Sequence, residues 1–168
     1  TVSAFYLKNV QGLDGNSVDP SIKGAHVHAW GAGATIDLGD SGLNIDGDFI
    51  QTRGNRDLGH ANLWTAGLNY GKVDLNKPGS FTLGVHYVRA DAGAYLLGNS
   101  ALDMTDQLEY GWDNGTGVKF WVAKAGVAVQ KNVELDAYYN FGAKAFDRYD
   151  DSTKDPANTW GVELNYAF

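Results

Sequence analysis

The chain has 168 residues and a formal net charge of −7, and it contains 22 glycines, 3 prolines and no cysteine. The negative charge argues against a nucleic-acid partner, because phosphate binding requires a basic surface. The lack of cysteine excludes disulfides, thiolate metal sites and a cysteine nucleophile. No apolar run approaches the roughly 18 residues that a transmembrane helix needs, whereas frequent glycines and aromatic residues are typical of antiparallel barrels.

Alternation of apolar and polar residues with a period of two recurs along the chain, and helical periodicity is almost absent. This alternation predicts about eight strands. Their expected spans are 1–10, 25–39, 43–54, 61–74, 81–96, 118–131, 133–146 and 158–168. Within 133–146, the alternation predicts that Ala143 joins the apolar face and that Lys144 joins the polar face.

The last expected strand separates its two faces most clearly. Trp160, Val162 and Leu164 fall on one face, and Gly161 and Glu163 fall on the other. An apolar face with aromatic residues near its ends suits a strand that crosses a bilayer. The same pattern along the chain predicts these membrane-interface aromatics: Trp30, Trp64, Tyr70, Phe81, Tyr87, Trp121, Tyr139, Phe141, Trp160, Tyr166 and Phe168.

The connections between the expected strands alternate in length. The longer, polar connections are residues 11–24, 55–60, 97–117 and 147–157, and the short turns are residues 40–42, 75–80 and 131–132. Short turns on one side and longer loops on the other are the layout of outer-membrane barrels, whereas a Greek-key sandwich does not predict it. We therefore expect an all-β, antiparallel, up-and-down transmembrane β-barrel in the bacterial outer membrane, with residues 1–168 as one domain.

Two stretches support a resemblance to a known family. The terminal sequence GVELNYAF (161–168) resembles the recognition signal of outer-membrane barrels, and NYGKVDLNKPGSFTLGVHYVRADAGAYL (69–96) resembles a porin hairpin. Together they are most similar to the OmpM-like porins of diderm Firmicutes, which carry S-layer-homology domains. The resemblance implies a trimer of larger barrels, each of about sixteen strands, and recognition of the last strand by the barrel-assembly machinery. This chain is about half as long and lacks the S-layer-homology region, so it is expected to be either a section of such a porin or a small barrel with similar hairpins.

The polar face holds the candidate pore-lining residues, which are Asp37, Asp46, Asp48, His86, Lys124, Glu134, Asp136, Lys144 and Glu163. In a wide barrel they would line an aqueous path that favours cations, and in a narrow one they would pair inside a filled interior. Inward glycines such as Gly67 and Gly84 would under-fill a narrow lumen and so favour the wider barrel. If the connection 97–117 folds inward, Asp103, Asp106 and Glu109 become filter residues.

Other polar patterns are too incomplete to predict a reactive site. His26 and His28 share a strand face, but no third metal ligand is identifiable. Asp14, Asn16 and Asp19 lack the closing glutamate of a calcium loop. No nucleophile elbow or Ser-His-Asp spacing occurs. The rim residues considered for a barrel enzyme are His28, Asp57, His60 and Ser100. We expect no catalytic residue, metal or cofactor.

The sequence therefore predicts a porin that passes ions and small hydrophilic solutes by diffusion, with a preference for cations. One alternative is a small, filled outer-membrane barrel with an anchoring or adhesion role. The second alternative is a soluble lipocalin-like binder, whose apolar face would point inward instead of toward lipid.

Overall fold

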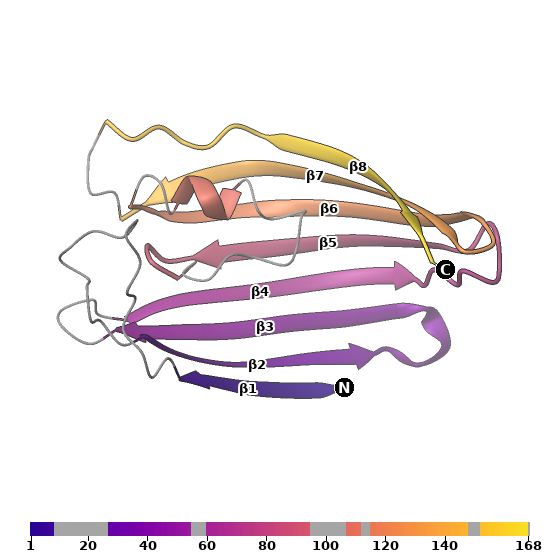
Figure 1. Cartoon of the computed structure of the whole chain (residues 1–168), viewed down its shortest axis with the longest axis horizontal. Coiled ribbons are helices and arrows are strands. Elements are labelled where there is room, and N and C mark those ends of the chain that lie inside the picture. The colour runs from indigo at the N-terminus through magenta and orange to yellow at the C-terminus, as the bar shows by residue number, and fades with distance from the viewer. Residues whose placement is uncertain (9–26, 55–59, 95–106, 112–114, 148–151, 168) are drawn as a thin grey trace.

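The computed structural model describes residues 1–8, 27–54, 60–94, 107–111, 115–147 and 152–167. In these residues, each strand pairs with its neighbour along the chain in one antiparallel 8-stranded sheet (Figure 1). The strands are β1 (Val2–Lys8), β2 (Val27–Asp37), β3 (Leu43–Gly54), β4 (His60–Gly71), β5 (Phe81–Ala90), β6 (Gly117–Gln130), β7 (Val133–Phe146) and β8 (Thr159–Tyr166). The predicted all-β, up-and-down arrangement is confirmed.

The ends of β4 and β5 differ from the predicted spans. β4 ends at Gly71, whose φ of +78° takes the chain out of the extended conformation. β5 ends at Ala90 because a turn follows, in which the Asp91 carbonyl accepts a hydrogen bond from the Ala94 amide. The Asp91 carboxylate also accepts hydrogen bonds from the backbone and side-chain amides of Asn62.

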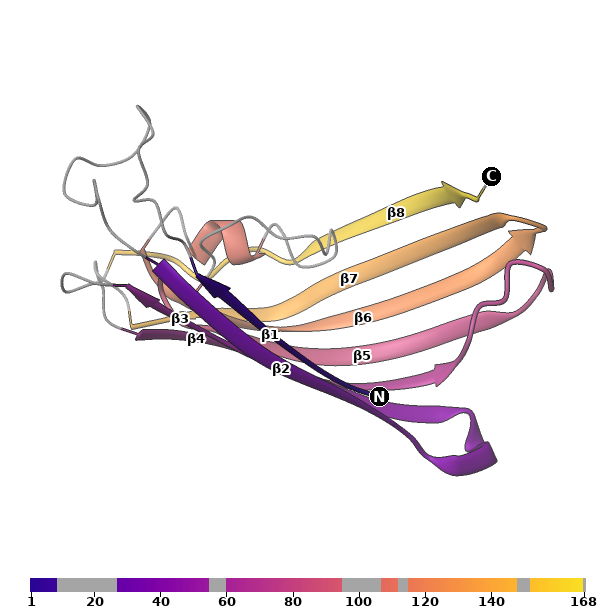
Figure 2. The same ribbon diagram turned by 60° about the horizontal axis from the view of Figure 1, so that its bottom comes forward.

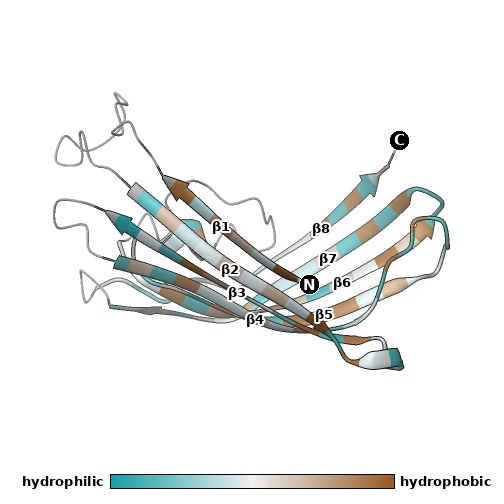
Figure 3. Ribbon diagram, turned by 90° about the horizontal axis from the view of Figure 1, so that it is seen from below, coloured by the Kyte–Doolittle hydropathy of each residue, from teal (hydrophilic) through white to brown (hydrophobic). Residues whose placement is uncertain are grey.

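The sheet is curved into a trough whose two rims are β1 and β8 (Figures 2 and 3). No backbone pairing joins β1 to β8 in the described part of the chain. The expectation of a complete small barrel is therefore wrong for these residues, because the two rims stay apart and the sheet is open.

The connections divide between the two ends of the trough as predicted (Figure 1). One end, called here the short-turn end, has the connections 38–42, 72–80 and 131–132. At the other end, called the long-connection end, β1, β3, β5 and β7 end and the next strands begin; in the sequence these strands are joined by 9–26, 55–59, 91–116 and 147–158. The predicted alternation of lengths fails at one place, because the β3–β4 connection is no longer than the β2–β3 turn and is shorter than the β4–β5 turn.

A bulge in β7 changes which face two residues occupy. The β6–β7 register shifts between the pairs Lys119↔Lys144 and Trp121↔Phe141, and Gly142 has a φ of +63°. Beyond the shift, the next two side chains of β7 lie on the faces opposite to those that simple alternation predicts. Ala143 is buried in the apolar cluster on the concave face, and Lys144 lies across from Lys119 on the convex face. The predicted faces of both residues are wrong because an extra residue in one strand reverses the alternation beyond it.

The buried core lies on the concave face at the long-connection end. Val88, Phe120 and Val122 are almost completely buried there, together with Leu108 of the helical turn 107–111. That turn sits inside the trough (Figure 2), so the face carrying Val88 and Phe120 is the concave one. Part of the long β5–β6 connection therefore folds inward.

Hydrogen bonds fix the helical turn to the segment that leads into β8. The Gln107 side-chain amide donates to the Ala157 carbonyl at 2.8 Å, and the Tyr110 hydroxyl donates to the Lys154 carbonyl at 2.5 Å. Side-chain packing against the sheet and hydrogen bonds to this segment therefore hold the turn on the concave face.

Candidate functional site

Hydrophobic and hydrophilic residues alternate along the strands, as the brown and teal bands show (Figure 3). Because successive side chains of a strand point to opposite faces, the two faces of the sheet differ in polarity. On the convex face, large apolar side chains are exposed over every strand. They include Val2, Tyr6, Trp30, Ile36, Ile45, Trp64, Leu68, Tyr70, Phe81, Leu83, Val85, Trp121, Leu135, Tyr139, Trp160, Val162, Leu164 and Tyr166. Soluble monomers rarely expose such a continuous apolar face.

Aromatic rings gather at two levels of the convex face. Toward the long-connection end, the ring of Tyr87 lies between those of Trp64 and Trp121, at centroid distances of 5.2 and 5.0 Å. The pairs Trp30–Phe49 and Tyr139–Phe141 extend this level across other strands. Toward the short-turn end, Tyr70 packs against Phe81.

Aliphatic residues fill the space between the two aromatic levels, for example the cross-strand row Ile36, Ile45, Leu68, Val85 and Ala123. The predicted interface aromatics thus occupy one face of the sheet, except that Phe168 lies outside the described residues. An aliphatic band bounded by aromatic residues is the surface pattern of barrels that cross a bilayer.

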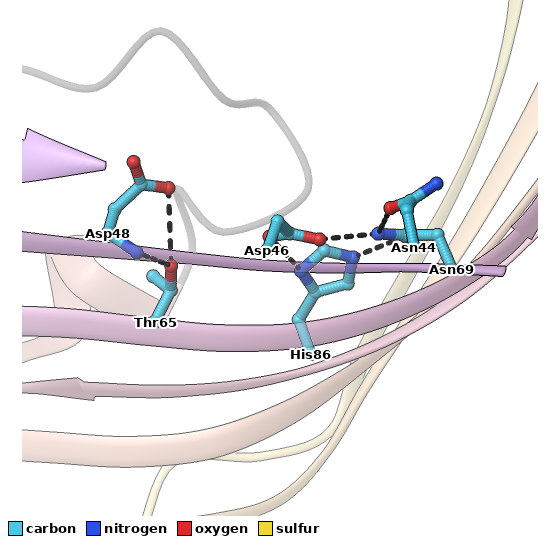
Figure 4. A network of polar contacts seen from close by, with 6 residues as sticks. All are labelled: Asn44, Asp46, Asp48, Thr65, Asn69 and His86. Atoms are coloured by element: carbon cyan, nitrogen blue, oxygen red, sulfur yellow. Dashed lines mark hydrogen bonds and ion pairs between the residues drawn. The ribbon is translucent and has the colours of Figure 1, made fainter. Parts of the chain in front are cut away.

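The concave face carries a polar network centred on His86 (Figure 4). Its Nδ1 lies 3.4 Å from an Asp46 carboxylate oxygen, and its Nε2 lies 2.9 Å from the Asn69 carbonyl oxygen. The Asn69 amide nitrogen donates to both Asp46 and Asn44, which fixes the orientation of the amide. Only 8% of His86 is exposed. Each ring nitrogen therefore faces an acceptor in a preorganised arrangement.

The residues of this network also line an open pocket. Thr65 Oγ1 lies 3.2 Å from the Asp48 amide and 3.4 Å from its carboxylate (Figure 4). The pocket has a volume of about 370 Å³, and its lining includes Thr1, Ser3, Asn44, Asp46, Asp48, Asn69, His86 and Lys124. Its polar lining and open mouth suit hydrated ions and small solutes better than a tightly held ligand.

A second acidic group lies on the concave face near the short-turn end. Asp136 pairs in register with Glu163 and accepts a hydrogen bond of 2.8 Å from the Asn165 amide. Glu134 lies on the same face of β7. Register also places Asp37 and Lys124 on the concave side, so among the predicted pore-lining residues only Lys144 lies on the other face.

The glycines of the concave face lie beneath long side chains of the neighbouring strands. A Cβ on Gly67 would come within 2.3 Å of His86 Nδ1, and one on Gly33 within 2.0 Å of an Asp48 carboxylate oxygen. Gly84 similarly lies beneath Asn69. The prediction that inward glycines leave space unfilled is therefore incomplete, because these glycines let polar side chains lie flat along the wall.

Gly67→Val is expected to push the His86 ring away from Asp46 and to lower the free energy of unfolding by about 1–3 kcal/mol, the usual cost of overpacking. Ala66→Val is the matched control, because Ala66 is the neighbouring residue on the exposed convex face. Denaturation of the folded chain in detergent measures both variants. Equal stability of the two would contradict the close packing of His86 over Gly67.

Asn44, Asn69 and Thr65 were not predicted as site residues, although Thr65 and Asn69 occupy polar positions of the alternation. That alternation could have included them, but sequence spacing did not indicate which polar residues meet across strands. The structure shows that β3, β4 and β5 bring them together with Asp46 and His86.

The residues considered for reactive sites do not converge in the described part of the chain. His28 and His60 are register partners of Arg53, one on either side of it. Asp14, Asn16, Asp19, His26, Asp57, Ser100, Asp103 and Asp106 lie outside the described residues. Within the described ranges, no cluster of three or more His, Asp or Glu side chains is arranged to hold a metal ion. The helical segments found there are too short or too polar to cross a bilayer.

Comparisons with known proteins add no family assignment. No protein-family model matches the chain, and a search of curated proteins returns no match. The geometry of the two faces of the sheet is therefore the basis for the function proposed below.

Proposed function

We propose that the chain forms part of the wall of an outer-membrane porin, through which ions and small hydrophilic solutes diffuse, with a preference for cations. The observation that carries this proposal is the separation of faces across one curved sheet. The convex face exposes apolar residues such as Leu68 and Val162, and the concave face holds the carboxylates Asp46 and Asp136. A soluble lipocalin-like barrel would have the opposite arrangement, with an apolar interior.

The proposal requires further strands along β1 and β8. Lipid offers no hydrogen-bond partner to the edge of a sheet, so a membrane-spanning sheet has to close. Because the sheet has 8 strands with up-and-down connections, β1 and β8 run in opposite directions. Opposite directions alone would equally allow β1 to pair with β8, but the two rims are unpaired in the described residues, so strands added between them would complete a barrel wider than the described sheet alone.

The inward position of the helical turn 107–111 supports a narrowed lumen. Leu108 anchors the turn to the core, whereas Glu109 on the same turn is exposed. We propose that this part of the β5–β6 connection reduces the cross-section of the channel. Glu109 would then add negative charge at the narrow region, consistent with a preference for cations.

The balance of charge on the concave face also supports cation preference. The acidic residues there are Asp37, Asp46, Asp48, Glu134, Asp136 and Glu163. The basic residues identified on the same face are Lys124 and His86. Acidic side chains along a water-filled path raise the local concentration of cations and lower that of anions.

The proposal is tested by single-channel recording of the protein in a planar bilayer across a salt gradient. We expect stable openings with a reversal potential that indicates cation selectivity. Asp46→Asn combined with Asp48→Asn is expected to move that potential toward zero. Asp40→Asn, in the exposed turn before β3, is the control for charge at the short-turn end. No openings from a folded, inserted protein would contradict the proposal.

The resemblance to OmpM-like porins remains a prediction, as do a homotrimer and recognition of the last strand by the barrel-assembly machinery. The alternative of a small, filled barrel loses support because β1 and β8 do not pair in the described residues. An anchoring or adhesion role remains an outcome of the same recordings, if the inserted protein forms no channel.

A further inference from the structure

Three cationic side chains form one cross-strand row on the convex face at the long-connection end. Arg89 of β5 is the register partner of Lys119 of β6, and Lys119 is the register partner of Lys144 of β7. Like charges directly opposite each other destabilise a sheet. The row is also unexpected in a chain with a net charge of −7. A bound anion would compensate the positive charge of this row.

The β7 bulge is what completes the row. Without the register shift at Gly142, Lys144 would point to the concave face. With it, Lys144 lies beside Lys119 on the face that carries the exposed aromatic residues. The same local irregularity thus removes a cation from the lumen and adds it to the convex surface.

The carboxylates near the row neutralise it only in part. Lys144 Nζ lies 2.9 Å from an Asp155 oxygen, and Arg89 Nε lies 3.7 Å from an Asp91 oxygen. Asp155 also accepts a hydrogen bond from the Ala145 amide, and Asp91 accepts two from Asn62. Lys119, in the middle, has no carboxylate within ion-pair distance among the described residues.

Aromatic side chains lie next to the row, and their level on the strands indicates where the row would lie in a bilayer. The Arg89 guanidinium lies over the Phe146 ring, 4.3 Å from its centroid. One step toward the middle of the strands, Tyr87 and Trp121 face each other in register and are in ring contact. Aromatic residues at this depth occupy the interface of a bilayer, so cations one step farther out lie at the level of the lipid headgroups.

We propose that Arg89, Lys119 and Lys144 bind the phosphate-bearing headgroups of anionic lipids in the leaflet nearest the long-connection end. This inference rests on the proposed membrane function. A phosphate group placed between the side chains would relieve their mutual repulsion. Arg89 can donate two parallel hydrogen bonds to phosphate oxygens, and the lysines add point charges.

Lipids with brominated acyl chains test the proposal, because bromine quenches nearby tryptophans and Trp64 and Trp121 adjoin the row. The protein is placed in phosphatidylcholine bilayers that contain an equal fraction of brominated phosphatidylglycerol or brominated phosphatidylcholine. We expect the anionic lipid to associate at least about fivefold more strongly, the effect of a single cation at a membrane surface. Arg89→Gln/Lys119→Gln/Lys144→Gln should remove this preference.

The matched control is Lys72→Gln/Lys77→Gln/Lys131→Gln, which removes the same charge from exposed positions at the short-turn end. It should retain the preference for anionic lipid. Equal quenching by both lipids in the unmodified protein would overturn the lipid site and leave the membrane proposal intact. Absence of quenching by either lipid would contradict both. Loss of the preference in inorganic phosphate, but not in chloride of equal ionic strength, would assign the row to free anions instead.

Discussion

Replacing Leu108 with aspartate is expected to release the helical turn 107–111 from the concave face and to raise single-channel conductance. Leu108 is 4% exposed and packs within the cluster that contains Val88 and Phe120. Removing such a side chain costs about 2–5 kcal/mol, and burial of an unpaired carboxylate adds to that cost. These terms exceed the few hydrogen bonds that hold the turn.

Hydrogen exchange of the 107–111 amides provides the second measurement, because an undocked turn exchanges faster. Glu109→Gln is the matched control for exchange, since Glu109 is exposed on the same turn and lies outside the apolar cluster. Rapid exchange in Leu108→Asp without any rise in conductance would contradict the role of the turn as a constriction while leaving its docking established.

An arginine at Val85 is expected to make folding into a bilayer less favourable by about 2–4 kcal/mol, the cost of a charge that faces lipid near the middle of a barrel wall. Val85 lies in the aliphatic row of the convex face. Thr82→Arg on the same strand is the control, because Thr82 faces the concave side, where Gly126 and Asp136 are its neighbours. Denaturant titration of the protein in lipid vesicles measures both variants.

The contrast between these two arginine variants is informative because they add the same charge to one strand. A lipid-facing Val85 predicts a large loss for Val85→Arg and a small change for Thr82→Arg. The reverse order would place the apolar face inside the molecule, as in a soluble binder, and would contradict the membrane proposal.

The alternation of residues was sufficient to predict the eight strands and most of their faces. In β8, the separation of Trp160 and Val162 from Gly161 and Glu163 follows directly from the two-residue period of a strand. The positions of Asp46, Asp48 and His86 on one face could also be predicted in this way. These features depend on local geometry, and each strand carries the information for its own faces.

Features that depend on more than one strand could not be predicted. The bulge at Gly142 exchanges the faces of Ala143 and Lys144, and the residues themselves alternate without interruption. The inward fold of the turn 107–111 depends on tertiary packing of Leu108. Contact between His86 and Asp46 depends on the register of β3, β4 and β5, which a single strand does not specify.

In the proposed membrane state, one face of the sheet contacts lipid and the other contacts water. The chain has no cysteine, so single cysteines can be introduced at positions 160 and 162–165 of β8 to carry a nitroxide label, leaving out Gly161, which lies beneath the Tyr138 ring. In a bilayer, we expect labels at 160, 162 and 164 to collide preferentially with oxygen, which partitions into lipid. Labels at 163 and 165 should collide preferentially with a water-soluble nickel complex. Protection of the even positions from both reagents, or an absence of alternation, would contradict the account.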